Sequence, residues 1–264
     1  MNIDYNALNI HALNWMLIMT RISFFFFAAP FFGSQAINKT VKSFIIAMLA
    51  YFIYTSGMVT PILEIPTMGI LFILMAKEMV IGVVLTSLAF MVYQPVRIIG
   101  VQVGRSAGLG RARMFNPEEN TQFTVVQQML YIVGILIFLG LNGHHIILRV
   151  IAISFKYIPI GNVYLNGKIV EIIINFFSKG FSLGLQCAAP IMSAILISSL
   201  CFGILGKTVP QMNLLILGLP IRVFIAMMGL FFALPIIGVV YQKFIVQSER
   251  SLMELVYIMS RGVR

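Results

Sequence analysis

The chain has 264 residues, of which 60% are hydrophobic and only 10% are charged, and its formal net charge is +10. A soluble domain carries about 25% charged residues, so this composition excludes an ordinary soluble globule and indicates an integral membrane protein. The basic residues are scattered between apolar runs and form no basic face interleaved with aromatic residues, which argues against nucleic acid as a partner.

Apolar runs recur along the chain, separated by proline, glycine or charge. They cover residues 8–32, 43–60, 67–93, 125–142, 146–158, 169–206 and 211–241, and a mixed-charge helical tail follows over 242–264. Because a helix needs about 20 apolar residues to cross a bilayer, this length predicts about six to seven helices. We therefore predict an all-α integral membrane protein with one membrane domain over 1–264. The run over 169–206 is long enough to hold a hairpin.

The first and third runs contain ionisable residues, which are costly in an apolar environment. Arg21 lies in the first run, and Lys77 and Glu78 are adjacent in the third. Neighbours on a helix do not share a face, so we expect Lys77 and Glu78 to pair with separate partners on other helices. A proton relay would need several acidic or imidazole groups in register, and only Glu78 and Glu171 are candidates, so interhelical pairing is favoured.

Residues 94–124 form the longest polar interruption, and this segment is basic and rich in glycine. Its charged residues are Arg97, Arg105, Arg111, Arg113, Glu118 and Glu119. A flexible basic loop amid apolar helices suggests a gate. The alternative is a cytoplasmic loop whose arginines fix the topology by the positive-inside rule or bind anionic lipid.

The segment Asn142-Gly143-His144-His145 predicts a polar helix end, with Asn142 or His144 satisfying terminal backbone groups. Consecutive histidines diverge on a helix, and the chain offers no histidine spacing typical of zinc, so we expect no metal.

Two enzyme motifs are incomplete. Gly206-Lys207-Thr208 lacks the first glycine of a P-loop, and Pro210 follows where a helix should begin. The glycines between 104 and 110 do not complete a dinucleotide fingerprint. Since no nucleophile or paired-carboxylate arrangement has usable spacing either, we predict no enzyme and no cofactor.

Prolines and glycines interrupt the apolar runs repeatedly. The prolines within or beside them are Pro30, Pro61, Pro66, Pro190, Pro210, Pro220 and Pro235. They predict kinked or interrupted helices. Irregular backbone at membrane depth must be buried in protein or line a cavity, so such a subunit is expected to need neighbours.

Several motifs, in order along residues 15–240, point to one family. They are Pro30-Phe31-Phe32-Gly33, Lys77-Glu78, Gln102-Val103-Gly104, Leu141-Asn142-Gly143-His144-His145 and Pro210-Gln211-Met212-Asn213. As an ordered set they resemble the FliR family, the R subunit of the flagellar type III protein-export gate. The related injectisome proteins share the architecture, but the Leu-Asn-Gly-His-His turn favours the flagellar branch.

The resemblance implies a hetero-oligomeric, helically arranged pore in the bacterial inner membrane at the flagellar basal body. This chain would join the P and Q subunits, contact the B subunit, other export proteins and membrane lipid, and help pass unfolded flagellar proteins out of the cytoplasm. Its hairpins would be raised toward the periplasmic side and buried against neighbours. The alternatives are the equivalent subunit of a virulence secretion system, and a small-solute channel or secondary transporter, for which no inverted repeat is detectable.

The resemblance also implies that a loop from Gly104 to Asn120 plugs the pore. Its candidate residues here are Gly104, Arg105, Gly108, Gly110, Arg111, Arg113, Met114 and Phe115. The stretch between Gln102 and Pro117 is longer than is usual in the family, and Asn116 stands where aspartate is common. A second set of residues is predicted to act in assembly or at helix breaks, namely Arg21, Lys77, Glu78, Asn142, His144, Pro210, Gln211 and Asn213.

Overall fold

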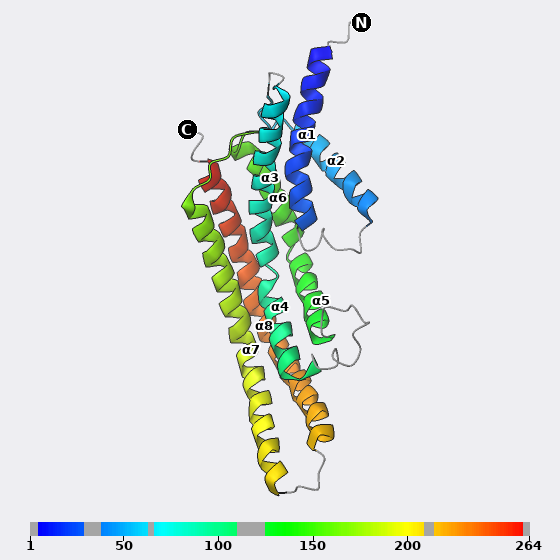
Figure 1. Ribbon diagram of the computed structural model, residues 1–264, viewed down its shortest axis with the longest axis vertical. Coiled ribbons are helices and arrows are strands. Elements are labelled where there is room, and N and C mark those ends of the chain that lie inside the picture. Colours follow the sequence, from blue (N-terminus) through cyan, green and yellow to red (C-terminus); the bar gives the residue numbers. More distant parts are fainter. Residues whose placement is uncertain (1–4, 29–37, 63–65, 110–124, 209–213, 261–264) are drawn as a thin grey trace. The chain divides into compact units, whose positions relative to one another are not determined.

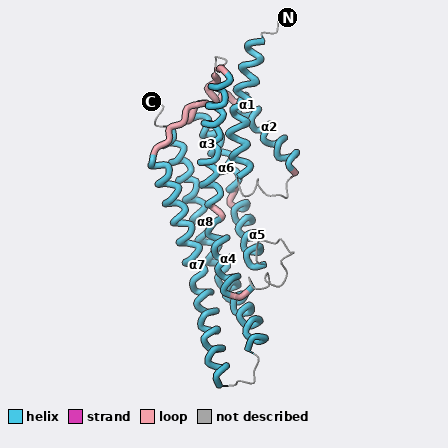
Figure 2. The backbone as a smooth tube through the Cα atoms, viewed as in Figure 1, coloured by secondary structure: helices cyan, strands magenta, loops and turns pink. Residues whose placement is uncertain are grey.

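The computed structural model describes residues 5–28, 38–62, 66–109, 125–208 and 214–260. Within these ranges the elements are helices, and no strand is present (Figure 2). They are α1 (Tyr5–Ala28), α2 (Lys39–Thr55), α3 (Met68–Met91), α4 (Gln94–Ser106), α5 (Val125–Gly140), α6 (Gly143–Tyr157), α7 (Gly167–Thr208) and α8 (Leu214–Ser260) (Figure 1). The prediction of an all-α protein is confirmed.

Helix α4 occupies the first part of the segment that the sequence predicts to be a loop. Pro95 lies in its first turn, where a missing N–H leaves no hydrogen bond unmade. Val96, Ile99 and Val103 recur at helical spacing and are buried. The loop prediction is therefore wrong over 94–106, because polar residues between these positions conceal one apolar face.

The long helices α7 and α8 have 42 and 47 residues and continue through internal prolines. Pro190 lies within α7, and Pro220 and Pro235 lie within α8. A proline removes one backbone hydrogen bond, which bends a helix without necessarily ending it. The hairpin alternative for 169–206 is wrong, and the predicted tail from 242 continues α8.

Three of the described helices are long and apolar enough to cross a membrane: α3, residues 167–207 of α7 and residues 218–260 of α8. Helices α5 and α6 meet at an angle of 64° and would add a fourth span if the bent pair counts as one. Helix α2, with 17 residues, is shorter than the roughly 20 residues that a span needs.

The chain divides into two compact units that interleave along the sequence. The first unit consists of Met1–Met91, Asn142–Phe176 and Gln247–Arg264, and the second of Val92–Leu141 and Phe177–Val246. Both α7 and α8 contribute to each unit, so no linker marks a boundary. The single membrane domain stays a prediction.

In the first unit, α1 packs closely against α3. A Cβ atom at Gly82 would lie only 2.7 Å from the carbonyl oxygen of Arg21, so glycine is what permits this approach. One turn later, the Thr86 hydroxyl donates to the Gly82 carbonyl at 2.7 Å and to the Phe25 carbonyl at 3.4 Å. The face of α3 that packs against α1 thus carries a row of small or polar residues, namely Glu78, Gly82 and Thr86.

In the second unit, glycines bring α4, α7 and α8 together. A Cβ atom at Gly184 of α7 would lie 2.9 Å from the Pro95 carbonyl oxygen and 2.9 Å from the Ile98 side chain of α4. Gly229 of α8 faces Ile191 of α7 in the same way, with 3.1 Å to its Cγ2. Within this unit, α7 and α8 therefore run side by side (Figure 1).

Candidate functional site

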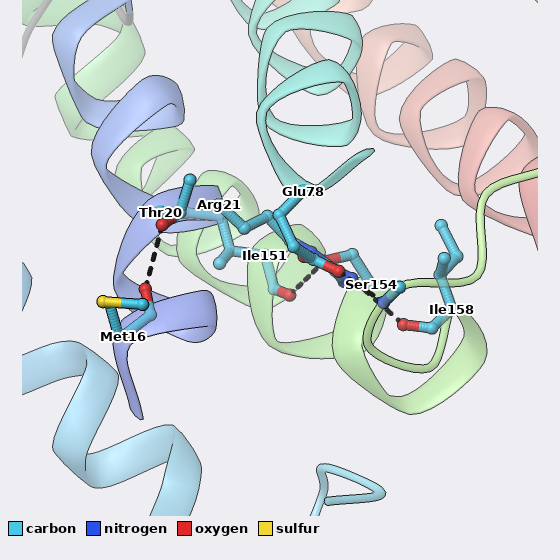
Figure 3. Close-up of polar contacts among 8 residues, drawn as sticks. Met16, Thr20, Arg21, Glu78, Ile151, Ser154 and Ile158 are labelled. Atoms are coloured by element: carbon cyan, nitrogen blue, oxygen red, sulfur yellow. Dashed lines mark hydrogen bonds and ion pairs between the residues drawn. The ribbon is translucent and has the colours of Figure 1, made fainter. Parts of the chain in front are cut away.

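A buried ion pair joins α1 to α3 in the first unit. The Arg21 Nε–H donates to Glu78 Oε2 at 2.5 Å, and the side chains of the two residues are 1% and 0% exposed (Figure 3). Both residues lie on helix faces made of apolar side chains: Leu17, Ile18, Ile22 and Phe25 on α1, and Ile81, Leu85 and Ala89 on α3. The pair is the only charge of either sign on this interface among the residues described as buried.

The remaining donors and acceptors of the pair bind the end of α6. Arg21 Nη1 donates to the Ser154 hydroxyl at 3.3 Å, and Arg21 Nη2 donates to the Ile158 carbonyl at 3.2 Å (Figure 3). The second carboxylate oxygen, Glu78 Oε1, accepts from the backbone N–H of Gly161 at 2.8 Å. The two charged groups therefore fasten α1, α3 and the turn after α6 to one another.

The turn that follows α6 is shaped for this contact. Gly161 has φ of +79°, a left-handed conformation that glycine adopts without strain, and a Cβ there would clash with the Leu74 side chain of α3. The Arg21 guanidinium also lies over the Phe155 ring, with 4.1 Å between Cζ and the ring centroid. An aromatic face stabilises a desolvated cation.

The interactions in this cluster hold the helices together. Two charges lose their hydration when they are buried, and only close geometry with additional hydrogen bonds offsets that cost. Both Glu78 oxygens accept hydrogen bonds here. Both oxygens are therefore occupied by donors from this chain, so the pairing interpretation is favoured over the relay.

Comparison with known proteins places the chain in a family. Residues 12–248 match the family described as bacterial export proteins, family 1. The chain belongs to this family. The resemblance to FliR proteins is confirmed, and the ion pair lies within the matched region of this export protein.

Several curated relatives share most of its length. The chain is 28% identical over 248 residues to the flagellar biosynthetic protein FliR of Bacillus subtilis, covering 92% of this chain and 95% of that protein. It is 30% identical to the protein of the same name from Aquifex aeolicus, covering 85% and 86%. With the Escherichia coli protein of that name it shares 24% identity, covering 86% and 87%.

Lys77 of this export protein does not join the ion pair. Its neighbour Glu78 has its partner on another helix, as the sequence predicts. Lys77 is half-buried, and no hydrogen bond or ion pair to it forms within the part of the chain that the structure describes.

The helix end predicted at residue 142 exists, and Asn142 satisfies terminal backbone groups of α6, although it does so through its backbone carbonyl. Asn142 is the N-cap of α6 in a left-handed conformation, with φ of 55°, and its side chain makes no capping bond. Its backbone carbonyl instead accepts from the N–H groups of His145 at 2.9 Å and Ile146 at 3.3 Å. The left-handed backbone aims the carbonyl, not the side chain, at the first turn. The Nδ1 atom of His144 is buried and has no hydrogen-bond partner in the part of the chain that the structure describes.

The structure describes three of the predicted plug residues. Gly104 is buried within α4, and Arg105 is exposed in its last turn. Gly108 has φ of +85°, and a Cβ there would lie 2.9 Å from Leu219 of α8. The other predicted plug residues, Gly110, Arg111, Arg113, Met114 and Phe115, lie outside the described residues. So do the predicted helix-break residues Pro210, Gln211 and Asn213.

Two residues that the sequence interpretation missed are important in the structure. Asn14 is 0% exposed on α1, where its amide donates to the Ile62 carbonyl at 3.0 Å and accepts from the Ile62 N–H at 2.9 Å. Arg222 lies within α8, and its Nε is buried with no hydrogen-bond partner among the described residues. The available signal was the same for both, namely a polar residue inside an apolar run.

Proposed function

We propose that this chain is a core membrane subunit of the flagellar protein-export gate. The observation that carries the proposal is the family match over residues 12–248, together with relatives that are named flagellar biosynthetic proteins and that align over nearly their full length. In this proposal the protein lies in the bacterial inner membrane at the flagellar basal body. Together with the P and Q subunits, it forms part of the pore through which unfolded flagellar proteins pass.

Apolar surface on α2 supports a role inside a larger assembly. Phe44, Met48, Tyr51 and Phe52 are between 63% and 71% exposed, and they recur at helical spacing. Helix α2 has only 17 residues, too few to span a bilayer on its own. An exposed aromatic face on a helix of this length fits burial against a neighbouring protein subunit.

The buried ion pair supports a rigid unit that assembles as one piece. Arg21 and Glu78 are satisfied by residues of this chain alone. In the proposed gate they therefore hold α1, α3 and the end of α6 in position before any partner binds.

Arg222, unlike Arg21, is not fully hydrogen-bonded by the described residues. It lies in the apolar helix α8, and its Nε is buried without a partner within the described chain. An arginine at such a position is expected to bind an acidic group or a backbone carbonyl of a neighbouring subunit in the proposed gate.

The plug remains part of the proposal through the resemblance to the FliR family. The predicted plug residues begin with Gly104 in the last turn of α4 and continue to Phe115, and in this proposal they narrow the pore. The exposed Arg105 and the left-handed Gly108 are consistent with a chain that leaves α4 sharply toward this segment.

Native mass spectrometry would test the proposed function. The chain would be affinity-purified in mild detergent after co-expression with candidate P and Q subunits. A discrete hetero-oligomer is the expected result, and the chain should also restore secretion and motility to a strain that lacks its own subunit. A stable monomer with both partners expressed but unbound would contradict the proposal and favour an autonomous transporter.

A further inference from the structure

Three tyrosines gather inside the second unit, away from the ion pair. Tyr93 lies in the turn between α3 and α4, and its ring packs against Phe138 and Tyr131 of α5, with centroid distances of 5.1 Å and 6.3 Å. Tyr241 reaches the same region from α8. Phe244, about one turn after Tyr241, lies against Gly180 of α7, and Pro95 of α4 lies beside the same glycine. The helices α4, α5, α7 and α8 thus converge on this cluster.

The hydroxyl groups of Tyr93 and Tyr241 are buried and lack partners. The two residues are 4% and 1% exposed, and neither hydroxyl has a hydrogen-bond partner within the described residues. A buried hydroxyl without a partner is costly, so buried polar groups in folded proteins are nearly always bonded to protein or to an ordered water. Two such groups in one cluster are therefore more informative than either alone.

Burial keeps the phenol of Tyr93 neutral. Burial raises the pKa of Tyr93 well above its ordinary value, and the neighbouring Tyr241 and Tyr131 raise it further. A neutral phenol offers one donor and two acceptor lone pairs. A neutral ligand that both donates and accepts would satisfy it.

We propose that a water molecule bound inside the second unit bridges the hydroxyls of Tyr93 and Tyr241. Water matches both groups because it has two donors and two acceptors, and buried waters typically make about three hydrogen bonds. Tyr131 is the third neighbour in the cluster, with its ring centroid 6.3 Å from that of Tyr93. Both hydroxyls are enclosed by this chain, so the site does not depend on the proposed function or on any partner subunit.

Water-edited solid-state NMR would detect this molecule directly. The full chain, labelled with ring-13C tyrosine, would be reconstituted in lipid bilayers, and the variants Tyr93→Phe and Tyr241→Phe would assign the two signals by their loss. We expect rapid transfer of water magnetisation to both rings although they are shielded from bulk solvent. Transfer as slow as that to a labelled buried phenylalanine would overturn the proposal.

A double-mutant cycle gives a second and independent measurement. If water bridges the hydroxyls, Tyr93→Phe and Tyr241→Phe should each lower the Tm of the purified protein by roughly 2–4 °C. The double variant should lose less than the sum, because the first substitution already weakens the bridge. In a dry site, each substitution would remove an unpaired hydroxyl and leave the Tm equal or higher, and that outcome would refute the bridge.

Tyr164→Phe is the matched control. Tyr164 is 45% exposed on the segment between α6 and α7, so its hydroxyl is satisfied by solvent. Its removal should leave the Tm unchanged. If one buried variant cannot be purified, the other still assigns its own signal, and the transfer of water magnetisation to that ring decides the question.

Discussion

Arg21 and Glu78 show how a charge can be kept inside an apolar helix interface. Each ionised group is bound by the other and by groups from the end of α6, so its hydration is replaced by fixed hydrogen bonds. Such a pair contributes little net stability compared with apolar residues of the same volume, but removal of one partner leaves a buried charge unsatisfied. The network is therefore expected to set the register of α1 against α3 more than to add stability.

Glu78→Gln should destabilise the protein by about 3–5 kcal/mol, because Arg21 then lacks a counter-ion. The paired replacement Arg21→Met with Glu78→Leu should cost clearly less than Glu78→Gln alone. Denaturant unfolding in detergent measures both. The control is Arg149→Ala, which breaks a 3.4 Å ion pair with Glu249 in which Arg149 is 63% exposed. Its loss should cost at most about 1 kcal/mol. Equal losses of stability in Glu78→Gln and Arg149→Ala would show that burial of the ion pair does not raise the cost of breaking it.

Arg222→Leu should leave the isolated chain folded and weaken its co-purification with P and Q subunits, since the proposed neighbour would lose its cation. The matched control is Arg250→Leu, at an exposed position near the end of the same helix. A pull-down with quantitative mass spectrometry compares the two. Equal recovery of partners by both variants would contradict the role proposed for Arg222.

At the scale of elements, glycine positions decide which helix faces meet. Gly82 of α3 and Gly184 of α7 have backbone or side-chain atoms of the facing helix within 3 Å of where a Cβ would stand, whereas Gly69 of α3 has nothing within 4 Å. The three residues look alike in the sequence. Only the first two are required by the packing of one helix on another.

Gly82→Ala should destabilise the protein by about 1–3 kcal/mol, because the added methyl meets the backbone of Arg21 and forces α1 away from α3. Gly69→Ala, on the same helix, should be neutral or stabilise by up to about 1 kcal/mol, since alanine favours helix. Thermal unfolding in one detergent compares them. Similar losses for both variants would mean that the α1–α3 contact is not the cause.

The segment after α4 carries the prediction about the plug. Deletion within 105–115 should make the assembled complex leak ions or small solutes, because the proposed narrowing of the pore would be lost. Conductance or dye efflux from proteoliposomes measures this leak, with co-purification confirming that the complex still forms. Unchanged permeability in an intact complex would exclude the plug.

At the scale of the whole molecule, the chain belongs to an export family and leaves large apolar side chains exposed on α2, α3, α7 and α8. Only three of its described helices qualify as spans, or up to four with the bent pair. A subunit of this kind is expected to be completed by lipid and by neighbours, which is why its assembly with partners is the decisive test of the proposed function.

The class of protein and its family follow from the amino-acid sequence alone. Apolar runs located α1, α3, α5 and the two long helices, because hydrophobic length is a local property that needs no knowledge of neighbours. The ordered motifs led to the export family, which the match over 12–248 confirms. The sequence also singled out Arg21 and Glu78, since a charge in an apolar run must find a partner.

The partners of those two charges become known only from the packing of the helices. Arg21 and Glu78 are 57 residues apart, and the Gly161 N–H that completes the site is 83 residues beyond Glu78. Neither separation has a periodic signature in the sequence. Helix α4 was missed for a related reason: its polar residues outweigh its apolar face until α5 and α7 are seen to cover that face. Local composition specifies helices, whereas interhelical bonds depend on packing between segments distant in the chain.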